Sequence, residues 1–182
     1  MNVRDAQLEV RTTYLGGFAG QLVAGILWLL SYALTTWISW RAGITTLVIG
    51  GMFIFPVTQM LLRFMGRPAS LSAENPLREL AIEVAFLVPL LLPVVGAAAL
   101  HRVEWFYPAT AVVVGAHYLP FAFLYGMRLF VFLSGIMVFT GIAIGLWAPA
   151  QGQLAGCLAA VTMIAFAFLG RRFVSTVRSA RA

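Results

Sequence analysis

Residues 77–100 read LRELAIEVAFLVPLLLPVVGAAAL, and the seventeen residues after Glu83 in this stretch carry no charge. A helix rises 1.5 Å per residue, so about 20 mostly apolar residues cross the hydrocarbon core of a bilayer. The apolar residues are continuous and do not alternate with polar ones, which is unlike the strands of a membrane barrel. The stretch therefore predicts a transmembrane helix.

The same criterion predicts five further helices along the chain. The composition agrees, because 62% of the 182 residues are hydrophobic and 10% are charged, against about 45–50% and about 25% in soluble domains. We expect an all-α integral membrane protein, a single transmembrane domain over residues 1–182 with six helices arranged as three hairpins. The predicted spans are 18–40, 43–62, 77–100, 105–126, 129–148 and 152–170.

All 12 basic residues are arginines, and their distribution predicts the orientation. With both termini in the cytoplasm, Arg41 and Arg102 alone lie outside, and this bias is the positive-inside pattern. The inside segments then hold Arg4, Arg11, Arg63, Arg67, Arg78, Arg128, Arg171, Arg172, Arg178 and Arg181. We expect a multi-pass protein of a bacterial cytoplasmic (inner) membrane whose net charge of +6 faces anionic lipid. Nucleic-acid binding is disfavoured, because no basic domain interleaved with aromatic residues is present.

The scarcity of reactive residues excludes several chemistries. The chain has no lysine for a Schiff base or a P-loop, and Asp5 is its only aspartate. His101, His117 and Cys157 cannot form a histidine cluster or a disulfide. We therefore expect no metal, no cofactor and no assignable catalytic residue, and an enzyme is the less favoured class.

Two ionisable residues lie within the predicted spans, where a central charge costs about 2.5–3.5 kcal/mol on insertion scales. Glu83 lies about two turns into the helix over 77–100, and His117 lies near the midplane, beside Tyr118 and three residues before Pro120. Polar groups at a comparable depth on the earlier helices are Gln21, Gln59 and Arg63.

If these six residues converge, they form a polar pocket in the cytoplasmic half of the bilayer. Glu83 is then its acid, His117 exchanges protons, and Arg63 balances charge or binds an anion. Structural roles for the same residues remain open. In these alternatives, Glu83 pairs with Arg63 or Arg11, His117 forms a hydrogen bond with a backbone carbonyl, and the two glutamines join neighbouring helices.

Prolines interrupt three of the predicted helices. On three helices, small residues recur at every fourth position. Pro56, Pro89, Pro93 and Pro120 each free a carbonyl, so these helices either enclose a cavity or are passively bent. The small-residue stripes predict close helix packing within the chain, with a homo-oligomer through the same faces as the alternative. They are Gly16–Gly20–Ala24, Gly141–Gly145 and Gly152–Gly156–Ala160.

Two local patterns complete the analysis. Gly51 with Pro56 and Gly115 with Pro120 have the same spacing, which is typical of a duplication but also arises by chance. Asn75-Pro76 predicts the start of the third helix, with asparagine as the N-cap.

Three function classes follow. The leading hypothesis is a small carrier or ligand-binding protein, with proton coupling as an option, whose ligand is lipophilic or amphipathic and whose other partners are membrane lipids. The second is an accessory or structural membrane protein. The third is a lipid-modifying enzyme with Ser134 and His117 as nucleophile and base. The sequence does not identify the substrate, the direction of movement or the oligomeric state.

Overall fold

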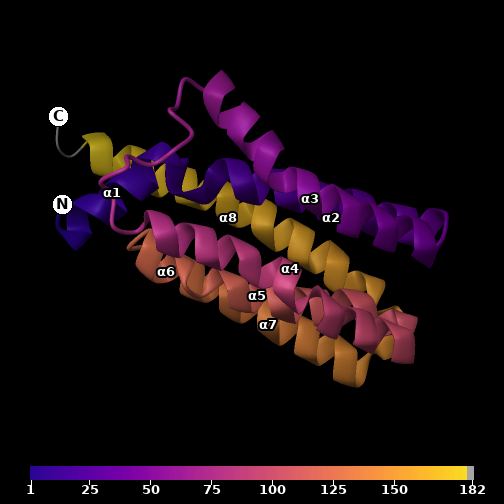
Figure 1. Cartoon of the computed structure of the whole chain (residues 1–182). Coiled ribbons are helices and arrows are strands. Elements are labelled where there is room, and N and C mark those ends of the chain that lie inside the picture. Colours follow the sequence, from indigo (N-terminus) through magenta and orange to yellow (C-terminus); the bar gives the residue numbers. More distant parts are fainter. Residues whose placement is uncertain (180–182) are drawn as a thin grey trace.

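The computed structural model describes residues 1–179, with side chains to Ser175, and this part of the chain is all helical (Figure 1). Arg181 lies outside the described residues, as does the side chain of Arg178. The elements are α1 (Val3–Thr13), η1 (Leu15–Gly17), α2 (Phe18–Trp37), α3 (Trp40–Phe64), α4 (Arg78–His101), η2 (Val103–Trp105), α5 (Phe106–Tyr118), α6 (Phe121–Leu124), α7 (Leu129–Trp147), η3 (Pro149–Gln151) and α8 (Gln153–Ser179).

Six helical segments of the described chain are long and apolar enough to cross a membrane, which confirms the multi-pass class. Each predicted span overlaps one of them, with boundaries that differ by at most five residues. They are Leu15–Trp37, Trp40–Phe64, Arg78–His101, Val103–Leu124, Leu129–Trp147 and Gln153–Ser175.

The fourth span is broken where the sequence predicted a continuous helix. Proline has no backbone N–H, and α5 ends at Tyr118 just before Pro120; the N–H of Leu119 bonds to the carbonyl of Ala116 in a tighter turn. By contrast α3 runs through Pro56 without interruption. The two segments with similar glycine–proline spacing therefore have different local structures.

Small residues let the helices approach closely within the chain. α2 packs most extensively against α8, and α5 against α7. A Cβ on Gly25 would lie 3.1 Å from the carbonyl oxygen of Ala160, and one on Gly141 would lie 2.6 Å from that of Pro108. The stripes that contain Gly16, Gly141 and Gly156 thus serve internal packing, as predicted. Gly20 instead faces Thr58 of α3.

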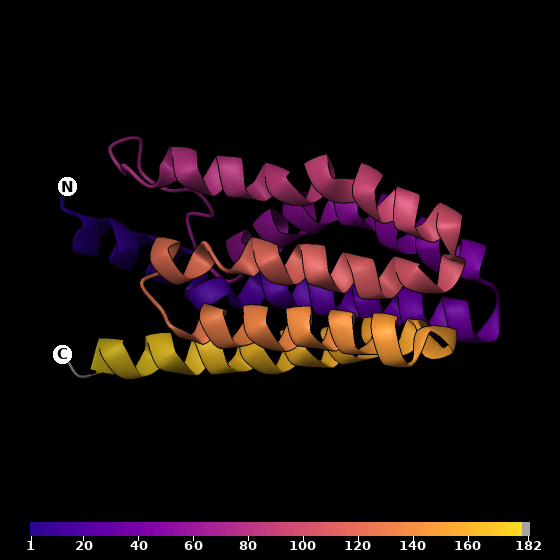
Figure 2. The same ribbon diagram turned by 90° about the horizontal axis from the view of Figure 1, so that it is seen from below.

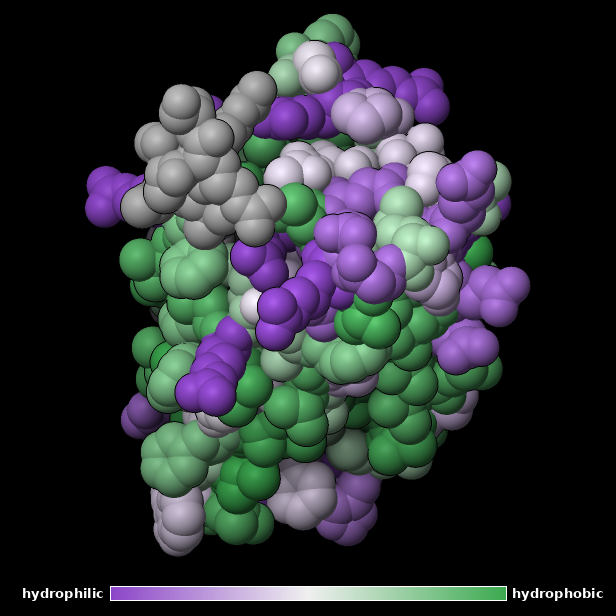
Figure 3. Space-filling model, turned by 90° about the vertical axis from the view of Figure 1, so that its left-hand side faces the viewer, coloured by the Kyte–Doolittle hydropathy of each residue, from purple (hydrophilic) through white to green (hydrophobic). Residues whose placement is uncertain are grey.

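Both termini lie at the same end of the bundle, and the six long segments run side by side between the two ends (Figures 1 and 2). Figure 3 looks onto the end with the termini, where hydrophilic residues gather over the upper part of the face. α3 and α4 are the outlying helices, with 6% and 11% of their apolar windows buried, against 44% for α2.

The helix α1 lies before the first predicted span, in a segment for which the sequence analysis predicted no helix. Asn2 caps α1 by accepting a bond from the N–H of Asp5, and Ala6 and Val10 are buried. Gln7 donates to the carbonyl of Phe123 at 2.6 Å, and Arg11 donates to that of Tyr125 at 3.0 Å. α1 is therefore attached to the turn between α6 and α7.

The loop between α3 and α4 is attached to α1 through Glu9. Its carboxylate accepts bonds from the N–H of Ser72 at 2.6 Å, the hydroxyl of Ser72 at 3.1 Å and the amide of Asn75 at 2.9 Å. Asn75 is not the N-cap of α4, which begins at Arg78. Its side-chain oxygen accepts from the N–H of Leu77 at 2.9 Å and forms a turn before the helix.

A satisfied polar cluster joins α2, α3 and α5 toward the end remote from the termini. The buried hydroxyl of Tyr107 lies 2.7 Å from the hydroxyl of Ser31 and 2.5 Å from that of Thr35, and it donates to the carbonyl of Ser31 at 3.1 Å. Ser31 in turn donates to the carbonyl of Gly43 at 2.8 Å. We call Ser31, Thr35, Gly43 and Tyr107 the tyrosine cluster.

The tyrosine cluster leaves no space for a side chain at Gly43. A Cβ there would clash with Thr35 Oγ1 and lie 2.7 Å from the hydroxyl of Tyr107. We expect Gly43→Ala to lower the free energy of unfolding by about 1–3 kcal/mol through overpacking. Gly135→Ala, where nothing lies within 4 Å of the added Cβ, should raise it by about 0.5–1 kcal/mol. Unfolding of the two purified variants in mixed detergent measures both, and equal effects would contradict the role of the cluster.

The three bonds to Glu9 make the docking of α1 dependent on pH. The backbone N–H of Ser72 is the main cause of a lowered pKa of Glu9, and Asn75 and the hydroxyl of Ser72 add to it. A lowered folded-state pKa stabilises the docked state above the ordinary glutamate pKa of about 4.3. That stabilisation is lost as the pH falls through the lower, folded-state value.

Hydrogen exchange at the Ser72 amide, corrected for intrinsic rates, measures this effect. Protection in the wild type should be full at neutral pH and decrease below about pH 4.3. Glu9→Gln should show weaker protection at neutral pH and no such step. An identical pH profile in the two proteins would exclude Glu9 as the anchor.

Candidate functional site

A cavity of about 380 Å³ lies among α2, α3, α4 and α5. This volume falls within the range of about 300–1,000 Å³ that is typical of small-molecule sites. Tyr125 and Phe130 close it toward the end with the termini, and Trp28 and Phe106 line it at the opposite end. No acidic residue, arginine or lysine lines it among the described residues.

Four polar atoms at the cavity are buried and have no hydrogen-bond partner among the described residues. They are Nε2 and Oε1 of Gln21, Oγ1 of Thr58 and Nδ1 of His117, and all three residues line the cavity. A buried polar group without a partner costs about 1–3 kcal/mol, and buried polar groups are rarely left unpaired. We call Gln21, Thr58 and His117 the polar triad.

The polar triad lies at one depth in the bundle. Gln21 is six residues from Leu15, Thr58 is six residues from Phe64, and His117 is seven residues from Leu124. At 1.5 Å per residue, each lies about 9–10 Å inside the end that carries the termini. The cavity therefore has one polar level, and its walls beyond that level are apolar.

Local structure brings each member of the triad to the cavity. Thr58 of α3 faces Gly20 of α2, where an added Cβ would be in ordinary van der Waals contact with the threonine, 3.9 Å from its Oγ1. The imidazole of His117 packs edge-on against Phe121, with centroids 4.9 Å apart, and approaches the backbone carbonyl of Val84. Phe121 is the first residue of α6, four residues after His117, so the contact with the imidazole spans the break between α5 and α6.

The structure brings together three of the six residues that the sequence singled out. Gln21, His117 and Tyr118 line the cavity, and the hydroxyl of the buried Tyr118 donates to Sδ of Met163 at 3.5 Å. This geometry agrees with the expected pocket for these three residues, while their role in binding stays a prediction.

The expected convergence is wrong for Glu83, Gln59 and Arg63, because none of them lines the cavity. Glu83 lies on the exposed face of α4, one residue from the buried Val84, and a helix turns about 100° per residue. Gln59 lies one residue after Thr58, so its side chain is likewise rotated away from the cavity that Thr58 lines. Arg63 is exposed at the end of α3. Arg102 and Glu104 form an ion pair near the end remote from the termini, with Nε and Oε2 3.9 Å apart, and no ion pair joins Glu83 to Arg63 among the described side chains.

Sequence reasoning missed Thr58, although a signal for it was present. Gly51 and Thr58 are seven residues apart and so share one face of α3, and both line the cavity. Ser134, the nucleophile of the enzyme hypothesis, is buried in α7 and does not line the cavity with His117. The described residues contain no group of three or more histidine, cysteine or acidic side chains that could hold a metal.

Comparison with known proteins gives one match. The family described as "Family of unknown function (DUF7010)" matches residues 3–172, which include α1 and all but the last residues of the six spans. No curated protein and no solved structure matches the chain. The cavity and its polar triad are therefore the basis for a functional argument.

Gln21 distinguishes a ligand site from a structural contact. If its amide joined helices, Gln21→Leu would destabilise the protein; because the amide has no partner, we expect the change to raise the free energy of unfolding by about 1–3 kcal/mol. The control is Gln59→Leu, at a half-buried position outside the cavity, which should have little effect. Detergent unfolding of both variants tests this, and a clear loss of stability in Gln21→Leu would show that the glutamine is structural.

Proposed function

Because the chain belongs to the DUF7010 family, whose function is unknown, we propose from its cavity that it binds a small amphipathic ligand within the bilayer, as a carrier or binding protein. The polar triad carries this proposal. A ligand head that both donates and accepts hydrogen bonds would pair with the amide of Gln21, the hydroxyl of Thr58 and the imidazole of His117. The apolar walls would hold the rest of the ligand.

The orientation that we propose places both termini in the cytoplasm of a bacterial cell. The arginines support it: the remote end of the bundle carries Arg41 and Arg102, and the end with the termini carries all the others whose side chains are described (Figure 1). These are Arg4, Arg11, Arg63, Arg67, Arg78, Arg128, Arg171 and Arg172. The polar triad then lies in the cytoplasmic half of the membrane.

The arrangement of the helices favours binding over the other classes. α3 packs closely against α2 and α4 packs mainly against α5, while the two helices hardly touch each other and both border the cavity. A cavity between two helices that hardly touch can change its volume at little cost in packing. Proton coupling is not part of this proposal, because it required Glu83 beside His117.

Ligand-induced stabilisation tests the proposal. A ligand that binds only the folded state stabilises it by RT ln(1 + [L]/Kd), about 2.7 kcal/mol at 100 times the Kd. We expect uncharged amphiphiles to raise the unfolding temperature of the wild type, read with a thiol-reactive dye at Cys157, the single cysteine. The ligand-induced rise in unfolding temperature should be lost in Gln21→Leu and in His117→Phe.

Glu83→Gln is the matched control, since it also changes a polar residue within a span but lies outside the cavity. It should keep the full ligand-induced increment. If no amphiphile stabilises the wild type, or if all four proteins respond equally, the binding role is excluded and the accessory, structural role is favoured.

A further inference from the structure

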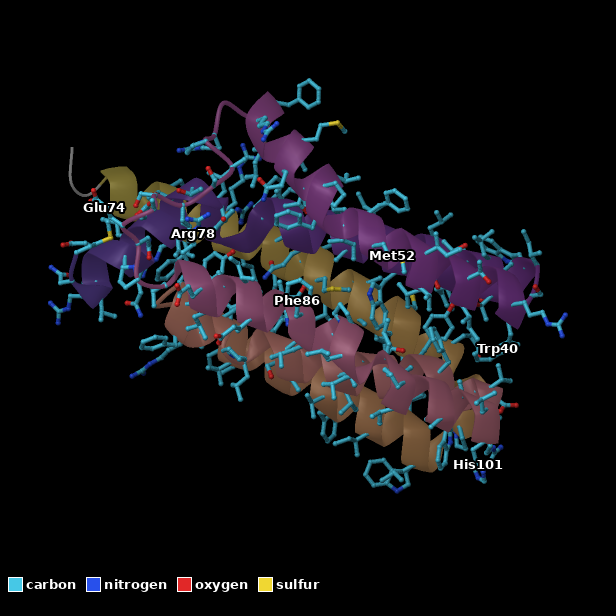
Figure 4. The ribbon with its side chains drawn as sticks, viewed as in Figure 1. Trp40, Met52, Glu74, Arg78, Phe86 and His101 are labelled. Carbon is cyan, nitrogen blue, oxygen red and sulfur yellow. The ribbon has the colours of Figure 1, made fainter. Side chains whose placement is uncertain are left out.

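The cavity is open sideways, between α3 and α4. These two helices line its opposite sides and yet hardly touch each other. Two of the lining residues on α3, Met52 and Phe55, are 71% and 67% exposed, and the lining residues Ala85 and Pro89 on α4 are exposed as well. Met52 on α3 and Phe86 on α4 mark the helices that border this opening, which we call the lateral mouth (Figure 4). Its exposed sides are apolar, so it faces lipid.

The route from the cytoplasmic end is closed. Tyr125 and Phe130 are buried, with ring centroids 4.8 Å apart, and both line the cavity at this end. α1 lies beyond them and is bonded through Arg11 to the carbonyls of Tyr125 and Gly126. The polar triad is therefore reached from the lipid and not from the water at this end.

Two backbone acceptors lie at the lateral mouth. Proline deprives the carbonyl four residues earlier of its helical hydrogen bond. For Pro56 that residue is Met52 and for Pro89 it is Ala85, and both line the cavity, one on each side of the mouth. A polar head with a hydrogen-bond donor thus finds acceptors on its way from the lipid to the triad.

The lining selects against charge. No acidic residue, arginine or lysine lines the cavity among the described residues, so a charged head would be buried without a counter-ion. The amide, hydroxyl and imidazole of the triad can donate to and accept from a neutral head. The cavity therefore fits a hydroxyl or amide head and not a carboxylate, phosphate or sulfonate.

We propose that the ligand is an uncharged lipid amphiphile that enters the cavity sideways from the bilayer, between α3 and α4, and places its hydroxyl or amide head at Gln21, Thr58 and His117. This inference rests on the proposed function and adds the ligand class and the route. The chain of the bound ligand passes Gly51 and Met52 and lies against the apolar walls that include Trp28.

Quenching of Trp28 by brominated lipids tests both the ligand class and the route of entry. Trp28 lines the cavity and is 3% exposed, so bilayer lipid outside the cavity does not reach it. The probes are an N-acylethanolamine and the N-acyltaurine with the same acyl chain, brominated along the chain at the depth of Trp28, in vesicles that contain the purified protein. The two probes share the acyl chain and the amide and differ only in the terminal group, which is a neutral hydroxyl in the first and a larger, charged sulfonate in the second. Subtracting the signal of Trp28→Phe isolates the Trp28 component from that of the other four tryptophans.

We expect the ethanolamide to quench Trp28 with an affinity at least about 100-fold higher than that of the taurine, because an unpaired buried charge costs several kcal/mol. Equal quenching by the two probes would overturn the ligand class while leaving binding intact. Quenching by neither would overturn the proposed function as well.

A bulky side chain at position 51 tests whether the ligand enters through the lateral mouth. Nothing lies within 4 Å of a Cβ at Gly51, so Gly51→Leu adds bulk at the mouth without disturbing the packing of helices. Gly135→Leu is the matched control, because Gly135 is equally open but lies on α7 outside the cavity. Gly51→Leu should slow the quenching by the ethanolamide at least about tenfold, as expected for a filled pocket. Equal rates in the two variants would exclude the lateral mouth as the route.

Discussion

The structure depends on the close approach of α2 and α8. Lipid chains are as apolar as leucine, so helices within a bilayer associate through van der Waals packing and not through the hydrophobic effect. Gly16 and Gly170 meet backbone to backbone, and Gly25 rests on the carbonyl of Ala160. This contact, the one between α2 and α3 and the one between α5 and α7 form a close-packed core. α4 packs less extensively, and α3 and α4 border the cavity on opposite sides.

The core contains two polar groups of different character. The tyrosine cluster is satisfied, because the hydroxyl of Tyr107 bonds to Ser31 and Thr35 and joins three helices. The polar triad has four unpaired atoms in the same span of membrane. Since an unpaired polar atom in lipid costs free energy, a site that keeps several of them together is better explained by a ligand than by packing. The contrast separates the structural polar residues from the functional candidates.

The sequence was sufficient for the six spans, because each is a long run of apolar residues and the bilayer sets the length of such a run. It also indicated the internal use of Gly141 and Gly156, whose spacing reports the face of a helix. It could not give the rotation of α4 about its axis. Glu83 was therefore placed in the pocket, although it lies on the exposed face and the neighbouring Val84 is buried. On α3 the same error of one residue led to the prediction of Gln59, whereas its neighbour Thr58 lines the cavity.

Long-range contacts account for the features that the sequence did not indicate. α1 has a polar composition and few apolar residues, and its docking depends on partners more than 60 residues away. The carboxylate of Glu9 links it to the loop that leads into α4, and Arg11 links it to the turn after α6. One polar helix is thus bonded both to the loop before α4 and to the turn that carries Tyr125, a residue of the cavity wall. Because both contacts belong to α1, this helix links the start of α4, which borders the lateral mouth, to the turn after α6 at the end with the termini.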